Sequence, residues 1–452
     1  MGNQELNLPM LQAMAERGEI DTIIMAAPDM QGRLQGKRVM PRFFFESVAQ
    51  DALEGCAYLL ATDVECQPIP GYSLMSWDQG FGDFILKPDL STLRLAAWQV
   101  GAAIVLCDIE LSGHQPAPMA PRTILKNQLN RLKTHGFTAW AATELEFILF
   151  KDSYESAWGN AYRDLTPANQ YNNDYSILGT ARVEPLIRRI RNTMEASGIQ
   201  VENSKGECNL GQHEINFRYG PALTACDKHV IYKEAAKEIA AEAGQALTFM
   251  AKFNEREGNS CHTHLSLCDE QGSSVFLDSD GHSPSRLFQQ FMAGMLRHAA
   301  EIMLFFAPNI NSYKRYVASS FAPTALAWGM DNRTCAFRVM GHGKSIHIEN
   351  RLPGGDVNPY LALAAMIAAG LAGIEGDYDP VPLFIGNAYE ADLPRVPHTL
   401  SDARQLFASS KFVCTAFGAD VVAHYSNMAK VEIDAFNAAV TDWERFRSFE
   451  RM

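Results

Sequence analysis

The sequence predicts an α+β protein with two domains or more, and three observations support this prediction. The chain has 452 residues, which is more than one hydrophobic core usually supports. Hydrophobic residues make up 47% of it and charged residues 20%, as in an ordinary globular protein. Strand-like segments and apolar helical stretches both occur along the chain, so helices and strands are mixed.

The first part of the chain, up to about residue 109, contains predicted strands at 22–27 and 102–107 and a predicted helix at 41–54. Residues 63–89 lie between them and are rich in Gly and Pro, so the pattern predicts a long irregular loop. A long irregular loop in a compact domain is usually functional or disordered.

A linker at 112–118 contains Gly and Pro and separates the two parts of the chain. We therefore assign residues 1–113 to the first domain and residues 118–452 to the second. In the second domain, charged strand-like segments alternate with predicted helices at 122–135, 235–252, 285–305 and 360–374.

The stretch 332–360 is the most informative segment of the sequence. It places Arg333, Arg338, Glu349 and Arg351 in strand-like sequence just before a long apolar helix. Side chains two residues apart on a strand project from one face, so Glu349 and Arg351 should lie together. A glutamate that can bind a cation lies here beside an arginine that can bind an anion. This pairing suits a site that binds both phosphate and a carboxylate. An edge strand with surface ion pairs is the alternative.

Two further segments carry paired carboxylates. Glu144 and Glu146 lie two residues apart in a segment that is otherwise as apolar as a buried strand. Burying ionised carboxylates is costly unless they are paired or coordinate a metal. Glu207 and Glu214 flank a predicted glycine turn at Gly211. A half-exposed strand and a solvated loop are the alternatives for these two segments.

Two more segments carry cationic or metal-binding side chains. His262 and His264 occupy one face of a predicted strand, an arrangement found in metal and nucleotide sites. Residues 311–316, with the sequence NSYKRY, form a basic cluster before an apolar run. Two histidines on a strand can also be ordinary surface residues.

Together these five ordered segments resemble the glutamine synthetase family over essentially the whole chain. The resemblance implies the α+β arrangement of the helices and strands, with a small N-terminal β-grasp-like domain and a C-terminal catalytic domain with a curved antiparallel sheet and flanking helices. In that family, ATP phosphorylates the γ-carboxylate of glutamate, and an amine then displaces phosphate to give a γ-glutamyl amide.

The resemblance also implies a metal site for two or three Mg²⁺ or Mn²⁺ ions, a choice that mostly oxygen ligands favour over zinc. The ions would bind the ATP phosphates and the γ-carboxylate. The ligands that it implies for two of the ions are Glu146, Glu207 and Glu214 for the first and Glu144, His262 and Glu349 for the second.

Other roles follow from the same resemblance. Arg333 and Arg338 are similar to the arginines that bind the transferring phosphate. Arg315, Arg351 and Gly258 match positions that bind glutamate and the phosphorylated intermediate, and His264 and Ser266 match positions that contact the nucleotide.

Phe321 is the most useful departure from the family pattern. It follows Asn311–Arg315 at the position where ordinary glutamine synthetases have a glutamate that helps to bind ammonium. An aromatic ring in place of that anion predicts an amine with an organic substituent, held partly by burial of apolar surface. The alternative is a loop that simply repacks around a hydrophobic plug.

Asp63 is the candidate base for the amine, although the family's usual aspartate motif does not surround it, and a loop-capping role is the alternative. Glu257 and His347 replace the family's usual asparagine and arginine near glutamate and adenine. Ala391 occupies the position of a regulatory adenylylation tyrosine, so Tyr389 is expected to be an ordinary loop residue.

Composition indicates the setting of the protein. The net charge of −13 argues against a general nucleic-acid surface. Nine cysteines without a C-x-x-C pair suggest reduced thiols in a cytoplasm. The N-terminus lacks the apolar core of a signal peptide, and no apolar run is long enough for a membrane helix, so we expect no membrane partner.

We therefore expect an ATP-dependent ligase that joins L-glutamate to a small organic amine, including amines taken up for assimilation. The resemblance implies a homo-oligomer of stacked hexameric rings, a dodecamer, with active sites between subunits. The alternatives are an authentic glutamine synthetase that uses ammonia and a non-catalytic structural or regulatory relative. Retention of all the proposed metal ligands and arginines argues against the latter.

Overall fold

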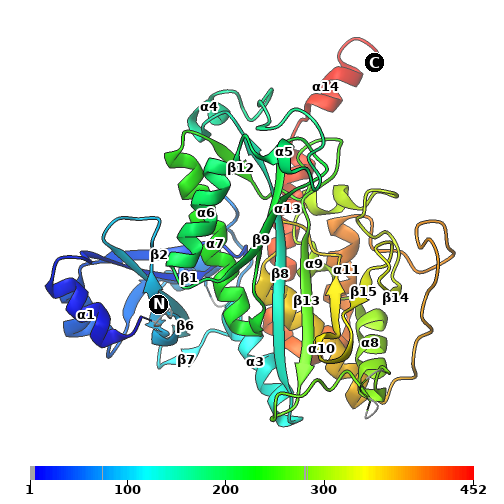
Figure 1. The fold of residues 1–452 in the computed structure, drawn as a ribbon, viewed down its shortest axis with the longest axis horizontal. Coiled ribbons are helices and arrows are strands. Elements are labelled where there is room, and N and C mark those ends of the chain that lie inside the picture. The colour runs from blue at the N-terminus through cyan, green and yellow to red at the C-terminus, as the bar shows by residue number, and fades with distance from the viewer. Residues whose placement is uncertain (1–5, 74, 279–280, 282) are drawn as a thin grey trace.

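The computed structural model describes residues 6–73, 75–278, 281 and 283–452. Seven strands of the N-terminal part form one sheet: β1 (Thr22–Pro28), β2 (Leu34–Val39), β3 (Leu53–Cys56), β4 (Asp83–Pro88), β5 (Arg94–Leu95), β6 (Ala102–Leu111) and β7 (Gln115–Pro116). The strand order is β2-β1-β6-β4-β3, with β5 and β7 also paired to β6. The neighbouring strands β1 and β6 run parallel, whereas the other pairs are antiparallel, so the sheet is mixed. It lies at one side of the molecule (Figure 1).

Two predictions for this part are wrong in extent. The helix expected at 41–54 is only α2 (Pro41–Phe43) followed by a π-helical turn (Phe44–Val48), and Leu53–Cys56 is strand β3. The stretch 63–89 is not irregular throughout, because Asp83–Pro88 forms β4 between β3 and β6. Both differences arise from pairing between strands that are distant in sequence, which overrides local pattern.

Nine strands of the second part form a larger curved sheet: β8 (Thr138–Phe150), β9 (Val201–Gly206), β10 (Gln212–Phe217), β11 (Gly220–Pro221), β12 (Ala246–Thr248), β13 (Cys261–Cys268), β14 (Trp328–Met330), β15 (Phe337–Met340) and β16 (His347–Asn350). The order is β14-β15-β16-β13-β8-β10-β9, and β11 and β12 also pair with β8. The long strands β8 and β13 lie at the centre of the molecule (Figure 1).

The remaining helices surround the two sheets, and α3 and α7 contact β8 whereas α10 contacts β13. They are α1 (Leu8–Glu16), α3 (Pro121–Thr134), α4 (Tyr154–Gly159), α5 (Ile177–Thr180), α6 (Glu184–Ala196), α7 (Ala222–Glu242), α8 (Arg286–His298), α9 (Met303–Phe306), α10 (Pro359–Glu375), α11 (Leu400–Ser409), α12 (Lys411–Phe417), α13 (Ala419–Ala438) and α14 (Asp442–Ser448). The last of these, α14, extends away from the body (Figure 1). Among the described residues, no helix has the length and apolar character to cross a membrane.

The helix expected at 235–252 is wrong at its end. α7 starts earlier and ends at Glu242, Gly244 adopts a left-handed conformation, and Ala246–Thr248 pairs with β8. The helix expected at 285–305 is divided into α8 and α9. The α+β prediction is confirmed, whereas the β-grasp-like description of the N-terminal part and the domain limits stay predictions.

A buried ion network joins the N-terminal sheet to the second part. Arg122 on α3 is 2% exposed and contacts Asp89, Asp108 and Asp227 at 2.9, 2.6 and 2.8 Å. Asp108 lies on β6 and Asp227 on α7. Because a buried guanidinium is unfavourable without such partners, the network fixes how α3 and α7 meet the N-terminal sheet.

Candidate active site

A cavity of about 690 Å³ lies over the second sheet. Side chains alternate along β8, so Thr143 bonds to His229 of α7 at 2.9 Å, whereas Glu144 and Glu146 on the opposite face line the cavity. The cavity brings together twelve of the predicted site residues: Glu144, Glu146, Glu207, Glu214, Gly258, His262, Arg315, Phe321, Arg333, Arg338, Glu349 and Arg351.

The register of the strands explains why these residues meet. Glu144 of β8 lies opposite His262 of β13, and Glu146 lies opposite Glu214 of β10. Glu349 of β16 lies opposite Arg338 of β15. Directly opposed residues in an antiparallel pair have neighbouring side chains, so the sheet itself assembles the site.

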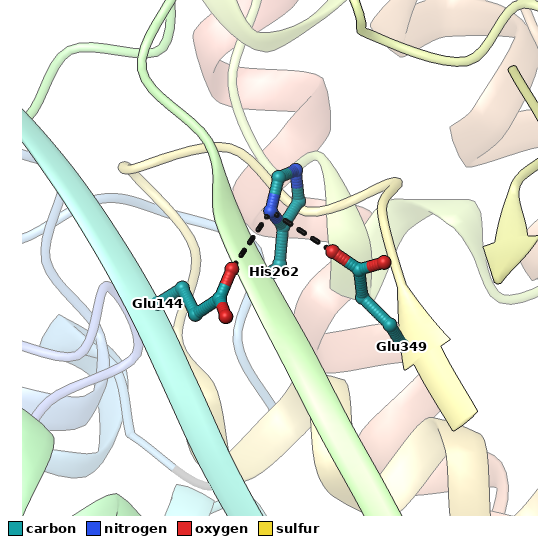
Figure 2. A group of neighbouring side chains, drawn as sticks. All are labelled: Glu144, His262 and Glu349. Carbon is teal, nitrogen blue, oxygen red and sulfur yellow. Dashed lines mark hydrogen bonds and ion pairs between the residues drawn. The ribbon is translucent and has the colours of Figure 1, made fainter. Parts of the chain in front are cut away.

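The first cluster consists of Glu144, His262 and Glu349. One ligand atom from each lies within 4.8 Å of the others. His262 Nδ1 is 3.3 Å from a carboxylate oxygen of both Glu144 and Glu349. Figure 2 shows the three side chains converging from neighbouring strands on one point.

The second cluster consists of Glu146, Glu207 and Glu214, again with ligand atoms within 4.8 Å of one another. Glu146 is held by the Ser260 amide and hydroxyl at 2.8 and 2.6 Å. Lys205 forms an ion pair with Glu207. This leaves three acids and one lysine at the end of the cavity formed by β8, β9 and β10.

The protonation equilibria of the second cluster fit a bound cation. The pKa values of Glu146, Glu207 and Glu214 are raised above the usual glutamate range. Burial is the larger cause, and the negative charge of neighbouring carboxylates is the second. Three such groups are costly to ionise together unless a cation joins them. An all-oxygen donor set suits Mg²⁺ or Mn²⁺.

The first cluster is electrostatically different. Burial opposes ionisation of Glu144, but hydrogen bonds to His262 and His264 outweigh it and hold its pKa below the usual range. Burial lowers the pKa of His262 to about 4. The imidazole is therefore neutral near pH 7, which is the form that binds metal ions.

Four arginines line the cavity from different elements. Arg338 contacts Glu349 at 3.1 Å and its Nε donates to Asp331 at 2.9 Å. Arg315 is 3% exposed and donates to the carbonyls of Arg351, Leu352 and Pro353. Arg333 is exposed and faces the open cavity, so it is free to meet an anionic ligand.

Phe321 lies on the cavity wall with 58% of its surface exposed. Its φ is +59°, and Ser319 two residues earlier has a φ of +62°. Its carbonyl accepts a hydrogen bond from Arg351 at 3.3 Å. An exposed aromatic ring therefore stands beside the buried charges of the site.

Gly258 has a packing reason to be glycine. A Cβ at this position would lie 2.3 Å from the carbonyl oxygen of Ala251 and 2.8 Å from Cγ of Arg315. A larger residue would therefore have to displace the Ala251 backbone, and it would also press against the Arg315 side chain.

Three predicted site residues lie outside the cavity lining. His264 Nε2 lies 3.2 Å from Glu144, and Ser266 donates to the Ile346 carbonyl at 3.1 Å. Asp63 accepts hydrogen bonds from the backbone of Glu65 and Gln67, both at 2.9 Å. In its own chain Asp63 therefore closes a turn, and its role as a base stays a prediction that depends on a neighbouring subunit.

The sequence interpretation missed several cavity residues. Lys205 and Ser260 contact the second cluster directly, and Tyr175 lines the cavity beside it. The two-residue spacing of Lys205, near the end of β9, and Glu207, just after it, was an available signal. Tyr175 has no such pattern around it, because it belongs to a loop that tertiary contacts place there.

The comparison with protein families decides the identity of the fold. Residues 118–448 match the family model described as glutamine synthetase, catalytic domain. The chain belongs to the glutamine synthetase family. Enzymes of the glutamine synthetase family use ATP and divalent metal ions, and the two acidic clusters are candidate sites for these ions.

Several relatives in the glutamine synthetase family are similar over almost their whole length. The chain is 56% identical over 447 residues to a γ-glutamylethanolamide synthetase of Streptomyces coelicolor, with 99% of this chain and 96% of that protein covered. It is 37% identical over 438 residues to a glutamate–isopropylamine ligase of a Pseudomonas species, with 96% and 95% covered. The solved structure of GmaS with ADP has a TM-score of 0.85 at 27% identity and covers 97% of this chain and 99% of its own.

Proposed function

We propose that this protein is an ATP-dependent ligase that joins the γ-carboxylate of L-glutamate to an organic amine and so produces a γ-glutamyl amide. The observation that carries the proposal is Phe321, an exposed aromatic ring on the wall of a cavity that also holds two acidic clusters and four arginines. The names of the two most similar relatives reported above, an ethanolamide synthetase and an isopropylamine ligase, support the same acceptor class.

The reaction proceeds in two steps. A γ-carboxylate oxygen of glutamate attacks the γ-phosphorus of ATP, the bond to ADP breaks, and γ-glutamyl phosphate forms. The amine nitrogen then attacks the γ-carbonyl carbon, phosphate leaves with the C–O bonding electrons, and the nitrogen loses a proton. Arg333 and Arg338 bind the phosphoryl oxygens, whose negative charge increases during transfer.

Two or three divalent metal ions would bind at the acidic clusters. Glu146, Glu207 and Glu214 would hold one ion, and Glu144, His262 and Glu349 would hold another, since in each set the ligand atoms lie within 4.8 Å of one another. When bound, Mg²⁺ or Mn²⁺ neutralises phosphate charge and orients the carboxylate for attack. His264 and Ser266 contact the nucleotide.

Glutamate binds beside the acidic clusters. Arg315 and Arg351 bind its carboxylate and the phosphorylated intermediate, and Gly258 leaves room for this contact. The buried carbonyl contacts of Arg315 fix its side chain before substrate arrives. A guanidinium held in this way loses little freedom on binding.

Phe321 selects the acceptor. A carboxylate here would attract ammonium, whereas an aromatic ring gains from covering the apolar substituent of an amine, by about 25 cal/mol per Å² of apolar area buried. The protein should therefore prefer a substituted primary amine over ammonia.

The active enzyme is a ring-forming homo-oligomer, with hexameric rings that stack into a dodecamer, and it works in the cytoplasm. All nine cysteines are free, which suits a reducing compartment. The loop that begins at Asp63 enters the site of the neighbouring subunit, where Asp63 accepts the proton of the amine.

The test is product analysis. Purified protein is incubated with ATP, Mg²⁺, L-glutamate and a panel of primary amines, and the products are identified by mass spectrometry. A γ-glutamyl amide formed in equal amount to released phosphate supports the proposal. Absence of phosphate release with every amine and with ammonia would exclude it.

A further inference from the structure

The loop at 317–325, called the Phe321 loop below, has a backbone that its own residues do not favour. Ser319 and Phe321 both have positive φ values, +62° and +59°. Residues other than glycine hold such conformations only when the surrounding structure imposes them. Contacts from outside the loop must therefore hold the backbone at Phe321, and one of them is the hydrogen bond from Arg351 to the Phe321 carbonyl at 3.3 Å.

The segment at 384–396, called the support segment below, holds the C-terminal end of the Phe321 loop. It pairs with the end of the Phe321 loop through a β-bridge between Ala325 and Arg395. The Leu326 amide donates to the Pro394 carbonyl at 2.7 Å, and the Val396 amide donates to the Thr324 carbonyl at 3.2 Å. These backbone bonds fasten one end of the loop.

The side chain of Arg395 strengthens the same connection. Its guanidinium donates to Thr324 Oγ1 at 3.4 Å, to the Tyr389 carbonyl at 3.2 Å and to the Ala391 carbonyl at 2.6 Å. One cation thus holds the turn of the support segment and contacts the Phe321 loop at the same time. Lysine has a single ammonium group, so it could make only some of these three hydrogen bonds.

Tyr389 belongs to the support segment, and its carbonyl accepts a hydrogen bond from Arg395. Its hydroxyl is buried and has no hydrogen-bond partner among the described residues. Burial raises the pKa of the Tyr389 phenol, and the nearby guanidinium groups of Arg351 and Arg315 and the backbone of Phe321 oppose the rise.

The support segment also contacts the loop that carries Arg333. The Ala388 amide donates to Thr334 Oγ1 at 3.0 Å, and the Asn332 side chain donates to the Gly386 carbonyl at 2.9 Å. Ala388 packs in a small core with Ala325, Ala327 and Cys335, which joins both loops to the segment.

We infer that the support segment positions Phe321 for recognition of the amine and that Arg395 is a positioning residue for acceptor selectivity. The inference rests on the proposed function, since it concerns the acceptor site of that reaction. Arg395 does not line the cavity, so it acts through the Phe321 loop and not through contact with substrate.

The first experiment compares Arg395→Gln, Arg395→Lys and wild type. A matched control is Arg286→Gln, which removes another exposed arginine, on α8, whose partner is the exposed Asp377. KM and kcat are measured for isopropylamine, ethanolamine, ammonia, glutamate and ATP. We expect Arg395→Gln to raise KM for the better organic amine about tenfold, the equivalent of one or two hydrogen bonds to a charged group. Arg395→Lys should recover part of this loss, and KM for ATP should change less than twofold.

The second experiment separates positioning from a general structural role. Arg395→Gln is combined with Phe321→Ala, and the amine selectivity of all four proteins is compared. If Arg395 acts through Phe321, its substitution has no further effect on selectivity once the ring is gone. An equal effect in both backgrounds, or a matching rise in KM for ATP, would overturn the inference. If the wild-type protein releases no phosphate with any amine, that result contradicts the proposed function itself and not only the role of Arg395.

Discussion

Arg351 donates a hydrogen bond to Glu349 at 2.6 Å, and both side chains are almost completely buried, at 4% and 1% exposed. The other carboxylate oxygen of Glu349 contacts Arg338 at 3.1 Å. Glu349 is thus held between two guanidinium groups while it faces His262 at 3.3 Å. The anion site and the proposed metal site therefore share one carboxylate, and loss of either arginine should disturb both.

The proposed metal ligands can be tested one cluster at a time. Glu144→Ala and Glu146→Ala each remove one ligand, so phosphate release should fall with every amine. Mutation of a residue that only hydrogen-bonds to a metal ligand typically lowers metal affinity or activity about 10- to 100-fold. Loss of a ligand itself should therefore lower activity at least about 100-fold. Glu270→Ala, in an exposed turn, is the control. Near-normal turnover of both variants at saturating Mg²⁺ would show that the assignment is wrong.

Acceptor choice is tested at the Phe321 loop. Phe321→Glu should shift kcat/KM away from the organic amine and toward ammonia, because an anion favours a small cation and disfavours an adjacent apolar substituent. We expect the ratio of the two kcat/KM values to change by about 10- to 200-fold, the range for loss of an apolar contact. Val317→Glu places the same charge at another exposed position of the loop and should change the ratio little. An unchanged ratio in Phe321→Glu would locate selectivity elsewhere, with residues 63–89 of the adjacent subunit as the next place to examine.

A site shared between subunits predicts complementation. Asp63→Ala and Glu146→Ala should each be inactive alone, since one removes the proposed base and the other a metal ligand. Coexpressed in equal amounts, they should form mixed rings with about a quarter of the wild-type activity, because a site needs both intact residues from two neighbouring chains. Failure of the mixture to recover activity, with mixed rings demonstrated by mass spectrometry, would exclude Asp63 as a residue supplied by the neighbour.

Acid stability should depend on His424, which is remote from the proposed metal ligands. Burial lowers its pKa to about 4 in the folded chain, against about 6.5 when unfolded. Below pH 6.5 the unfolded chain binds a proton that the folded chain does not, so the free energy of unfolding falls with pH until about 4. The loss is about 1.4 kcal/mol per pH unit for one such group. Urea denaturation at several pH values should show a smaller slope for His424→Gln, and an identical slope would contradict the assignment.

Part of this arrangement was predictable from the sequence. The two-residue period placed Glu349 beside Arg351 and Glu144 on the same face as Glu146, and the structure brings these residues into one cavity. The end of α7 was not predictable, because Ala246–Thr248 becomes a strand only through pairing with β8. Tyr389 was expected to be an ordinary loop residue, and its link through Arg395 to the Phe321 loop depends on tertiary contacts that no local pattern encodes. The roles of the individual site residues stay predictions.

The most direct test of the central claim is a comparison of kcat/KM for ammonia with kcat/KM for ethanolamine, isopropylamine and other primary amines. Phosphate release is measured with the wild-type protein at saturating ATP, Mg²⁺ and L-glutamate. We predict that at least one organic amine exceeds ammonia by about tenfold or more, because Phe321 favours an apolar substituent. If ammonia instead has the highest kcat/KM of all the acceptors, the protein is a glutamine synthetase in activity and the γ-glutamyl amide proposal is contradicted.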